Sequence, residues 1–144
     1  MSRKPHLNHV AMSLPADALD ADGRAAICRF YGDVFGWQEY DMLTEDRKRL
    51  VLRVHSDEQF VFLIADDPPM TCPRLDHFGM SVATVEEFQD LWSKVEAKAA
   101  ADPDVEPIAP TMENHYDVLK LHSFYVRYKL PMMVEVQCFE YLTG

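Results

Sequence analysis

The sequence has few cysteines, fewer basic than acidic residues, and no long apolar run. Its three cysteines form no CxxC pair and are odd in number, so a disulfide framework is not expected and a reducing compartment is the default. The 14 basic against 24 acidic residues give a net charge of −10, which argues against nucleic acid because phosphates need Lys and Arg. No apolar stretch reaches the roughly 20 residues that span a bilayer, and "MSRKPHLNHV" contains no signal-type stretch. We therefore expect a cytoplasmic protein whose partner is neither a membrane nor a nucleic acid.

The sequence does contain an internal repeat. "LNHVAMS" at residues 7–13 returns as "LDHFGMS" at residues 75–81, and the leucine, histidine, methionine and serine are kept. An apolar stripe with helical spacing follows each copy. The stripes are Ile27, Phe30, Tyr31 and Val34 in the first half, and Phe88, Leu91, Trp92 and Val95 in the second. Gly36 is a suitable left-handed end for the first helix, and Thr84 with Glu87 fits the capping box that begins the second.

Three strand-like segments follow each predicted helix. In the first half they are "WQEYDML", "RLVLRVH" and "QFVFLIA"; in the second they are a weak one around "EPIAP", then "LKLHSFYVRY" and "MMVEVQCFEY". Each half is therefore predicted to run strand, helix, three strands. The halves span about residues 5–66 and 73–142 and meet at the turn-rich residues 66–73. Because this seam is too short for a flexible linker, residues 1–144 are predicted to form one domain.

The first strand of each half presents a histidine beside small residues. Since alternate residues of a strand face opposite sides, His9 shares a face with Ala11 and Ser13, and the apolar residues share the other. His77 is placed in the same way, with Gly79 and Ser81. A divalent metal held by two histidines usually takes a carboxylate as well. The last strand offers Glu135, an acidic residue in an apolar segment that is expensive to bury unless it is paired or metal-bound.

These positions, together with "RFYGDVFGW" at residues 29–37, resemble the vicinal oxygen chelate superfamily. Its members include glyoxalase I, methylmalonyl-CoA epimerase, fosfomycin-resistance transferases, extradiol dioxygenases and bleomycin-binding proteins. The resemblance implies an α+β fold in which two βαβββ modules form a cupped, incomplete mixed β-barrel flanked by helices. It also implies that His9, His77 and Glu135 bind a divalent metal ion (Fe, Mn, Zn, Ni or Co), and that the protein is a homodimer.

The sequence departs from the four-ligand pattern of some members, which take a further Glu or Gln from the last strand of the first half. Under the repeat, Glu135 corresponds to Phe62, or to Leu63 if the register slips by one, and neither can bind metal. Gln59 lies only at the start of that strand. The three-ligand pattern is therefore expected. The "DPDG" turn that usually precedes the last strand is replaced by "YKLPM".

Three residues are candidates for catalysis. Glu135 would act through the metal, His122 is a candidate acid or base, and Tyr125 is a candidate donor of a proton or hydrogen bond to an oxyanion. His122 is also consistent with a half-exposed strand histidine, and Tyr125 with ordinary cross-strand packing. His9 and His77 are also consistent with hydrogen-bonded residues that line a pocket without binding metal.

The resemblance implies a metal-dependent enzyme in which the ion chelates oxygens of a small-molecule substrate and stabilises an enolate- or oxyanion-like intermediate. Both a lyase or isomerase and a ring-cleaving dioxygenase are consistent with the sequence. The alternative is a metal-free small-molecule or drug-binding protein of the bleomycin-resistance kind, for which the acidic balance suits a cationic drug. A third possibility is an interaction subunit without chemistry.

Overall fold

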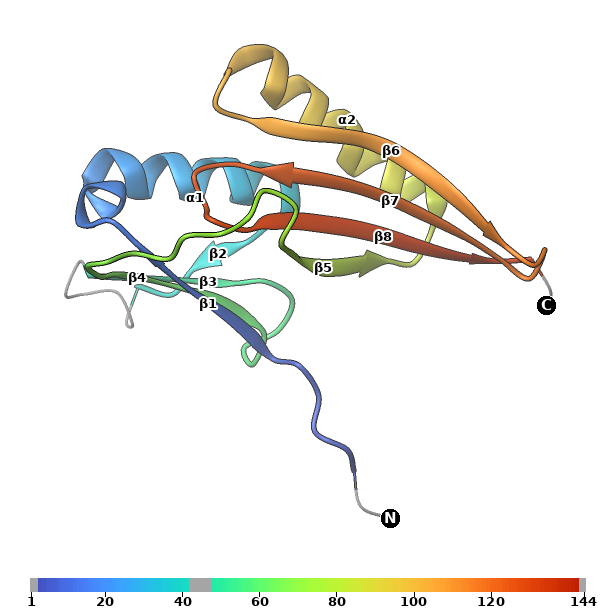
Figure 1. Cartoon of the computed structure of the whole chain (residues 1–144), viewed down its shortest axis with the longest axis horizontal. Coiled ribbons are helices and arrows are strands. Elements are labelled where there is room, and N and C mark those ends of the chain that lie inside the picture. Colours follow the sequence, from blue (N-terminus) through green and yellow to red (C-terminus); the bar gives the residue numbers. More distant parts are fainter. Residues whose placement is uncertain (1–2, 42–47, 143–144) are drawn as a thin grey trace. The chain divides into compact units, whose positions relative to one another are not determined.

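The computed structural model describes residues 3–41 and 48–142, which divide into two compact units with the boundary between Met70 and Thr71. That boundary lies inside the segment 66–73, where the sequence predicts the seam. Each unit contains one four-stranded mixed sheet and one long α-helix (Figure 1). The α+β prediction is confirmed, and neither sheet closes into a barrel within the described ranges.

Unit 1 comprises β1 (His9–Leu14), the short 3₁₀ helix η1 (Ala16–Leu19), α1 (Ala21–Phe35), β2 (Gln38–Glu39), β3 (Arg49–Arg53) and β4 (Phe60–Ala65). The strand order is β1-β4-β3-β2, and β1 runs parallel to β4 while the other neighbours are antiparallel. The predicted strand over residues 37–43 is shorter in the structure, because only Gln38 and Glu39 pair with β3. Its last two residues lie outside the described part of the chain.

The first helix begins and ends where its local chemistry dictates. Asp20 is the N-cap, and its carboxylate accepts a hydrogen bond from the Gly23 amide at 2.8 Å. Gly36 ends the helix with a φ of 74°, a left-handed conformation that glycine adopts without strain, so the predicted end is confirmed. The predicted apolar stripe is buried, and Tyr31 within it stacks on Trp37 with ring centroids 4.8 Å apart.

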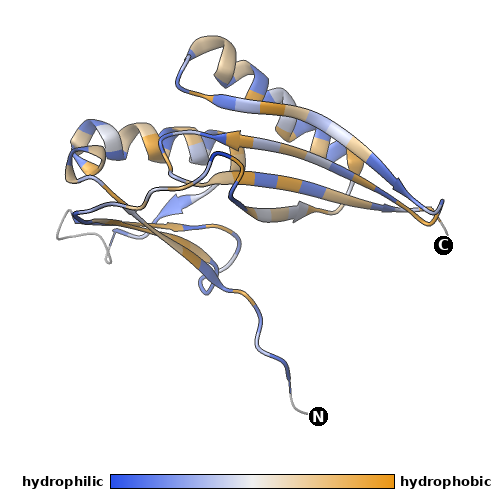
Figure 2. Ribbon diagram, viewed as in Figure 1, coloured by the Kyte–Doolittle hydropathy of each residue, from blue (hydrophilic) through white to orange (hydrophobic). Residues whose placement is uncertain are grey.

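Unit 2 repeats this order with longer strands: β5 (His77–Val82), α2 (Val85–Ala101), β6 (Glu106–His115), β7 (Leu119–Arg127) and β8 (Met133–Tyr141). The strand order is β5-β8-β7-β6, with β5 parallel to β8. Polar and apolar residues alternate along β8, as expected when one face of the sheet packs under a helix (Figure 2). β6 extends well beyond the predicted residues 106–110, because β7 pairs with it along almost its full length.

The second helix covers one face of the sheet in unit 2. Its predicted capping box is confirmed: Thr84 Oγ1 accepts from the Glu87 amide, and the Glu87 carboxylate accepts from the Thr84 amide. Phe88 and Trp92 project from α2 onto Phe124 of β7, with ring centroids 5.1 and 5.3 Å apart. Among the described helices, none is long and apolar enough to cross a membrane.

The parallel strand pairs of the two units have the same register. His9 pairs with Phe60 and Ala11 with Phe62 in unit 1, whereas His77 pairs with Met133 and Gly79 with Glu135 in unit 2. Phe62 is therefore the structural counterpart of Glu135, and the alternative with Leu63 is excluded by the pairing.

Candidate functional site

Three strands of unit 2 bring His77, Tyr125 and Glu135 to one face of the sheet. Glu135 on β8 pairs with Gly79 on one side and with Tyr125 on the other, and paired residues share a face. This is the face opposite α2, since the rings that α2 contacts belong to the alternate residues of β7. Gly79 borders the carboxylate: a methyl group at that position would be in ordinary van der Waals contact with Glu135 Oε1, at 3.7 Å.

His77 is oriented by the backbone just before its strand. Its Nδ1 lies 2.8 Å from the carbonyl oxygen of Leu75. Since a carbonyl oxygen only accepts, Nδ1 carries the hydrogen, and in the neutral ring Nε2 holds the lone pair. That Nε2 lies 3.8 Å from Glu135 Oε1. The imidazole therefore presents its potential ligand atom to the carboxylate.

Glu135 is buried, with 7% of its surface exposed, and Tyr125 is its hydrogen-bond donor. The hydrogen bond to Glu135, with burial and the charge of that carboxylate as smaller causes, raises the pKa of Tyr125 to about 12. The phenol consequently stays protonated at neutral pH and acts as a donor. The Tyr125 ring also meets the His77 ring edge-on, with centroids 5.1 Å apart. These three residues form a connected polar cluster, which we call the His77 cluster.

His9 belongs to unit 1, where it has a comparable local setting. Its Nδ1 lies 2.8 Å from Asn8 Oδ1. This side-chain oxygen accepts the hydrogen bond from His9, as the Leu75 carbonyl accepts one from His77. The imidazole stacks on Phe60 with centroids 4.8 Å apart and an interplanar angle of 9°. Phe62, the counterpart of Glu135, lies on the same face of this sheet.

His122 lies on the opposite face of the sheet from the His77 cluster. Its register neighbour is Cys138, and its ring packs against Phe88 of α2 with centroids 5.8 Å apart. His122 Nε2 is 2.6 Å from Glu140 Oε2. The structure therefore does not bring this candidate acid or base to Tyr125 and Glu135. Tyr125 lies three positions after His122 on β7 and so faces the other side of the sheet, and Glu135 pairs with Tyr125.

Comparison with solved structures gives matches along nearly the whole chain. A lactoylglutathione lyase from Agrobacterium tumefaciens is 17% identical, with 95% of this chain and 96% of that chain covered and a TM-score of 0.61. A fosfomycin resistance protein from Listeria monocytogenes is 13% identical, with 94% of each chain covered and a TM-score of 0.59. A glyoxalase/bleomycin resistance protein/dioxygenase from Nocardioides is 10% identical, with 100% and 88% covered and a TM-score of 0.61.

The chain has the same fold as these glyoxalase-type structures. The expected resemblance is thereby confirmed for the fold. The sequence itself matches no family model and no curated protein significantly.

Within this glyoxalase-type fold, the donor set of the His77 cluster is suited to a divalent metal. A ligating histidine typically donates its other ring N–H to a carbonyl oxygen, as His77 does to Leu75. A buried carboxylate beside the free ring nitrogen supplies an anionic oxygen donor. In the described residues no three His, Cys, Asp or Glu side chains gather closely enough to hold an ion, so the cluster contributes two donors.

Two features of the cluster could not be found from residue types alone. The Leu75 carbonyl is a backbone group, and no pattern of side chains predicts its hydrogen bond to His77. The bond between Tyr125 and Glu135 depends on the pairing of β7 with β8. The available signal was the glycine of "LDHFGMS", which indicated space beside the histidine but not what occupies it.

Proposed function

We propose that this chain is a metal-dependent enzyme that acts on a small-molecule substrate, and that His9, His77 and Glu135 are its metal ligands. When bound, a divalent ion would supply Lewis-acid chemistry, drawing electron density from oxygens of the substrate. The reaction would be that of a glyoxalase-like lyase or isomerase, or of a dioxygenase. The observation that carries the proposal is the pairing of the His77 Nε2 lone pair with a buried carboxylate 3.8 Å away.

The chain's own residues would prepare the site in three ways. The Leu75 carbonyl and Asn8 Oδ1 would hold His77 and His9 in the tautomer that leaves Nε2 for a ligand. The Tyr125 hydroxyl, neutral at physiological pH, would fix one carboxylate oxygen of Glu135 by donating to it. The absence of a side chain at Gly79 keeps the approach to Glu135 open.

The test is the metal content of protein purified without a histidine tag, measured by elemental mass spectrometry. We expect about one divalent ion per chain in the wild type, and loss of most of it in His77→Ala and in Glu135→Gln. His115→Ala is the matched control, because His115 is exposed and its ion-pair partner is Glu113, which is not one of the three residues of the cluster. If both cluster variants retain stoichiometric metal at unchanged affinity, the ligand assignment is wrong. Iron as the ion would favour the dioxygenase, and a redox-silent ion the lyase or isomerase.

A second candidate is a metal-free protein that binds a small molecule. It is favoured by the apolar character of the unit 1 face, where His9 stacks on Phe60 and Phe62 occupies the position that corresponds to Glu135. A stacked imidazole beside phenylalanines suits an aromatic ligand as well as a metal. Wild-type protein that takes up no ion when dialysed against Fe, Mn, Zn, Ni or Co would support this candidate and contradict the first.

A further inference from the structure

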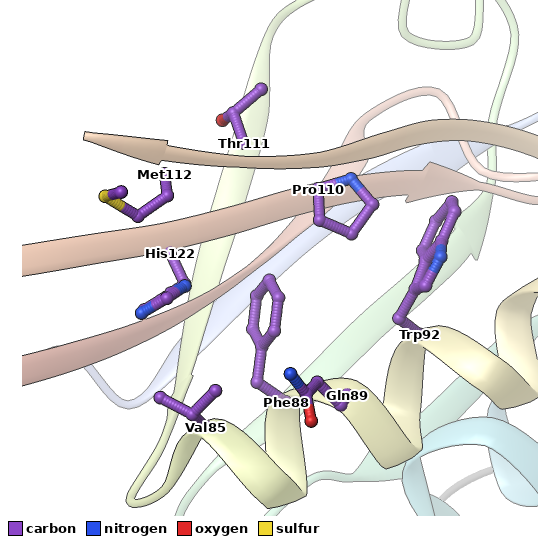
Figure 3. Close-up of a pocket in the computed structure, with 8 residues that line it drawn as sticks. All are labelled: Val85, Phe88, Gln89, Trp92, Pro110, Thr111, Met112 and His122. Carbon is purple, nitrogen blue, oxygen red and sulfur yellow. The ribbon is translucent and has the colours of Figure 1, made fainter.

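A pocket of about 280 Å³ lies on the helix-covered side of unit 2, away from the His77 cluster (Figure 3). Phe88 and Trp92 rise into it from α2, and Pro110 and Met112 close it from β6. His122 of β7 contributes the one imidazole. The full lining is Val85, Phe88, Gln89, Trp92, Pro110, Thr111, Met112 and His122.

A β-bulge in β6 opens this pocket. Ile108 pairs with Tyr125 and Thr111 with Ser123, so Ala109 and Pro110 together lie opposite the single residue Phe124. Proline cannot donate a ladder hydrogen bond, which suits it to a bulge on an edge strand. The bulge falls where Pro110, Thr111 and Met112 line the pocket. The pocket thus lies at the β-bulge of β6.

His122 gives the pocket an oriented acceptor in aromatic surroundings, beside the polar residues Gln89 and Thr111 that also line it. Glu140 Oε2 can only accept, so His122 Nε2 carries the hydrogen of their 2.6 Å bond. In the neutral ring, Nδ1 is then an acceptor, and the hydrogen bonds described for His122 involve Nε2 alone. None of the eight lining residues is Lys, Arg, Asp or Glu. These features favour an uncharged ligand that donates one hydrogen bond.

The volume indicates the size of that ligand. An engineered apolar cavity of about 150 Å³ holds one benzene molecule. The pocket here has nearly twice that volume and is half open to solvent, so two fused rings would fit in it with part of their surface exposed. We propose that the pocket between α2 and β6 binds a neutral bicyclic aromatic compound, packed on Phe88 and Trp92, whose single N–H or O–H donates to His122 Nδ1.

The test uses indole as the probe and 1-methylindole, which lacks the N–H, as its matched analogue. Binding is followed by nuclear magnetic resonance of the labelled protein, at the Trp92 side chain and the His122 ring, with EDTA present so that metal plays no part. We expect saturable binding in the millimolar range, with indole about fivefold tighter than 1-methylindole because of one additional hydrogen bond. His122→Phe keeps an aromatic ring and should bring the two affinities together.

Two surface variants of α2 locate the site without disturbing the core. Gln89 is exposed and lines the pocket, so Gln89→Trp should fill the pocket and weaken indole at least about tenfold. Lys94 is exposed on the same helix and does not line the pocket, so Lys94→Trp should bind as the wild type does. No saturation at about 10 mM indole would overturn the proposal, as would equal weakening by both variants. Equal wild-type affinity for the two probes would overturn the role of His122.

Discussion

Removing one hydroxyl group, in Tyr125→Phe, tests how the His77 cluster is held together. Tyr125 is the hydrogen-bond donor to Glu135, whose surface is only 7% exposed. The phenylalanine keeps the ring, and with it the edge-on contact to His77 at 5.1 Å. The perturbation is therefore confined to one hydrogen bond to one buried carboxylate.

The expected magnitude differs between the metal-free and the metal-loaded protein. Without metal, the carboxylate loses a donor that water replaces poorly, so the free energy of unfolding should fall by about 1–3 kcal/mol. With metal, Tyr125 would act as an outer partner of a ligating carboxylate, and loss of such a partner typically lowers metal affinity about 10- to 100-fold. The ligand itself remains in place, so the affinity should fall less than in Glu135→Gln.

The assay is competition for metal against a chromogenic chelator, together with urea unfolding of the EDTA-treated protein. Tyr128→Phe is the matched control, because it also removes a phenol–carboxylate hydrogen bond, from Tyr128 to Asp102 at 3.0 Å, without touching the cluster. Tyr128→Phe should lower stability but leave metal affinity unchanged. Equal metal affinities for the wild type and Tyr125→Phe would refute the positioning role, and equal losses in both variants would show an unspecific effect of stability.

Two further predictions rest on described contacts, and a third tests the expected homodimer. Thr84→Ala removes the N-cap of α2 and should lower the free energy of unfolding by about 1 kcal/mol in urea titrations, whereas Thr84→Ser should change it little. Burial is the largest cause, and the Glu39 carboxylate the next, of a rise in the pKa of Cys28 from 9.0 to about 11. At pH 8 the thiolate fraction of Cys28 should therefore be about a hundredfold lower in the native than in the unfolded chain, and Cys28 should react correspondingly more slowly with iodoacetamide. This thiol should favour the folded state up to pH 9 and lose that contribution towards pH 11. Light scattering after gel filtration should give the mass of a homodimer, and a monomer at micromolar concentration would contradict that expectation.

Much of the fold could be predicted because its signals are local. The helix ends rest on single residues, Gly36 and Thr84, whose chemistry acts within one turn. β6 was underestimated because the exposed pattern from Thr111 to His115 has no apolar alternation, and its strand character comes from pairing with β7. Pairing between distant segments overrides local preference in edge strands.

The candidate site was predictable only in part, since a sequence gives faces but not contacts. The alternation of β5 and β8 correctly placed His77 and Glu135 on their faces, and the strand register then made them neighbours. The same alternation puts His122 on the other face from Tyr125, because Tyr125 lies three positions after it along β7.

The comparison of the two halves explains why the polar chemistry gathers in unit 2. Both halves keep a histidine at the start of the first strand and a small residue two positions later. Opposite that small residue, unit 1 has Phe62 and unit 2 has Glu135, with Tyr125 as the donor to the latter. A buried carboxylate is stable only with such partners, whereas a phenylalanine needs none. The repeat has thus kept one imidazole in each half, and among the described residues the carboxylate and the hydroxyl group beside that imidazole are found in the second half.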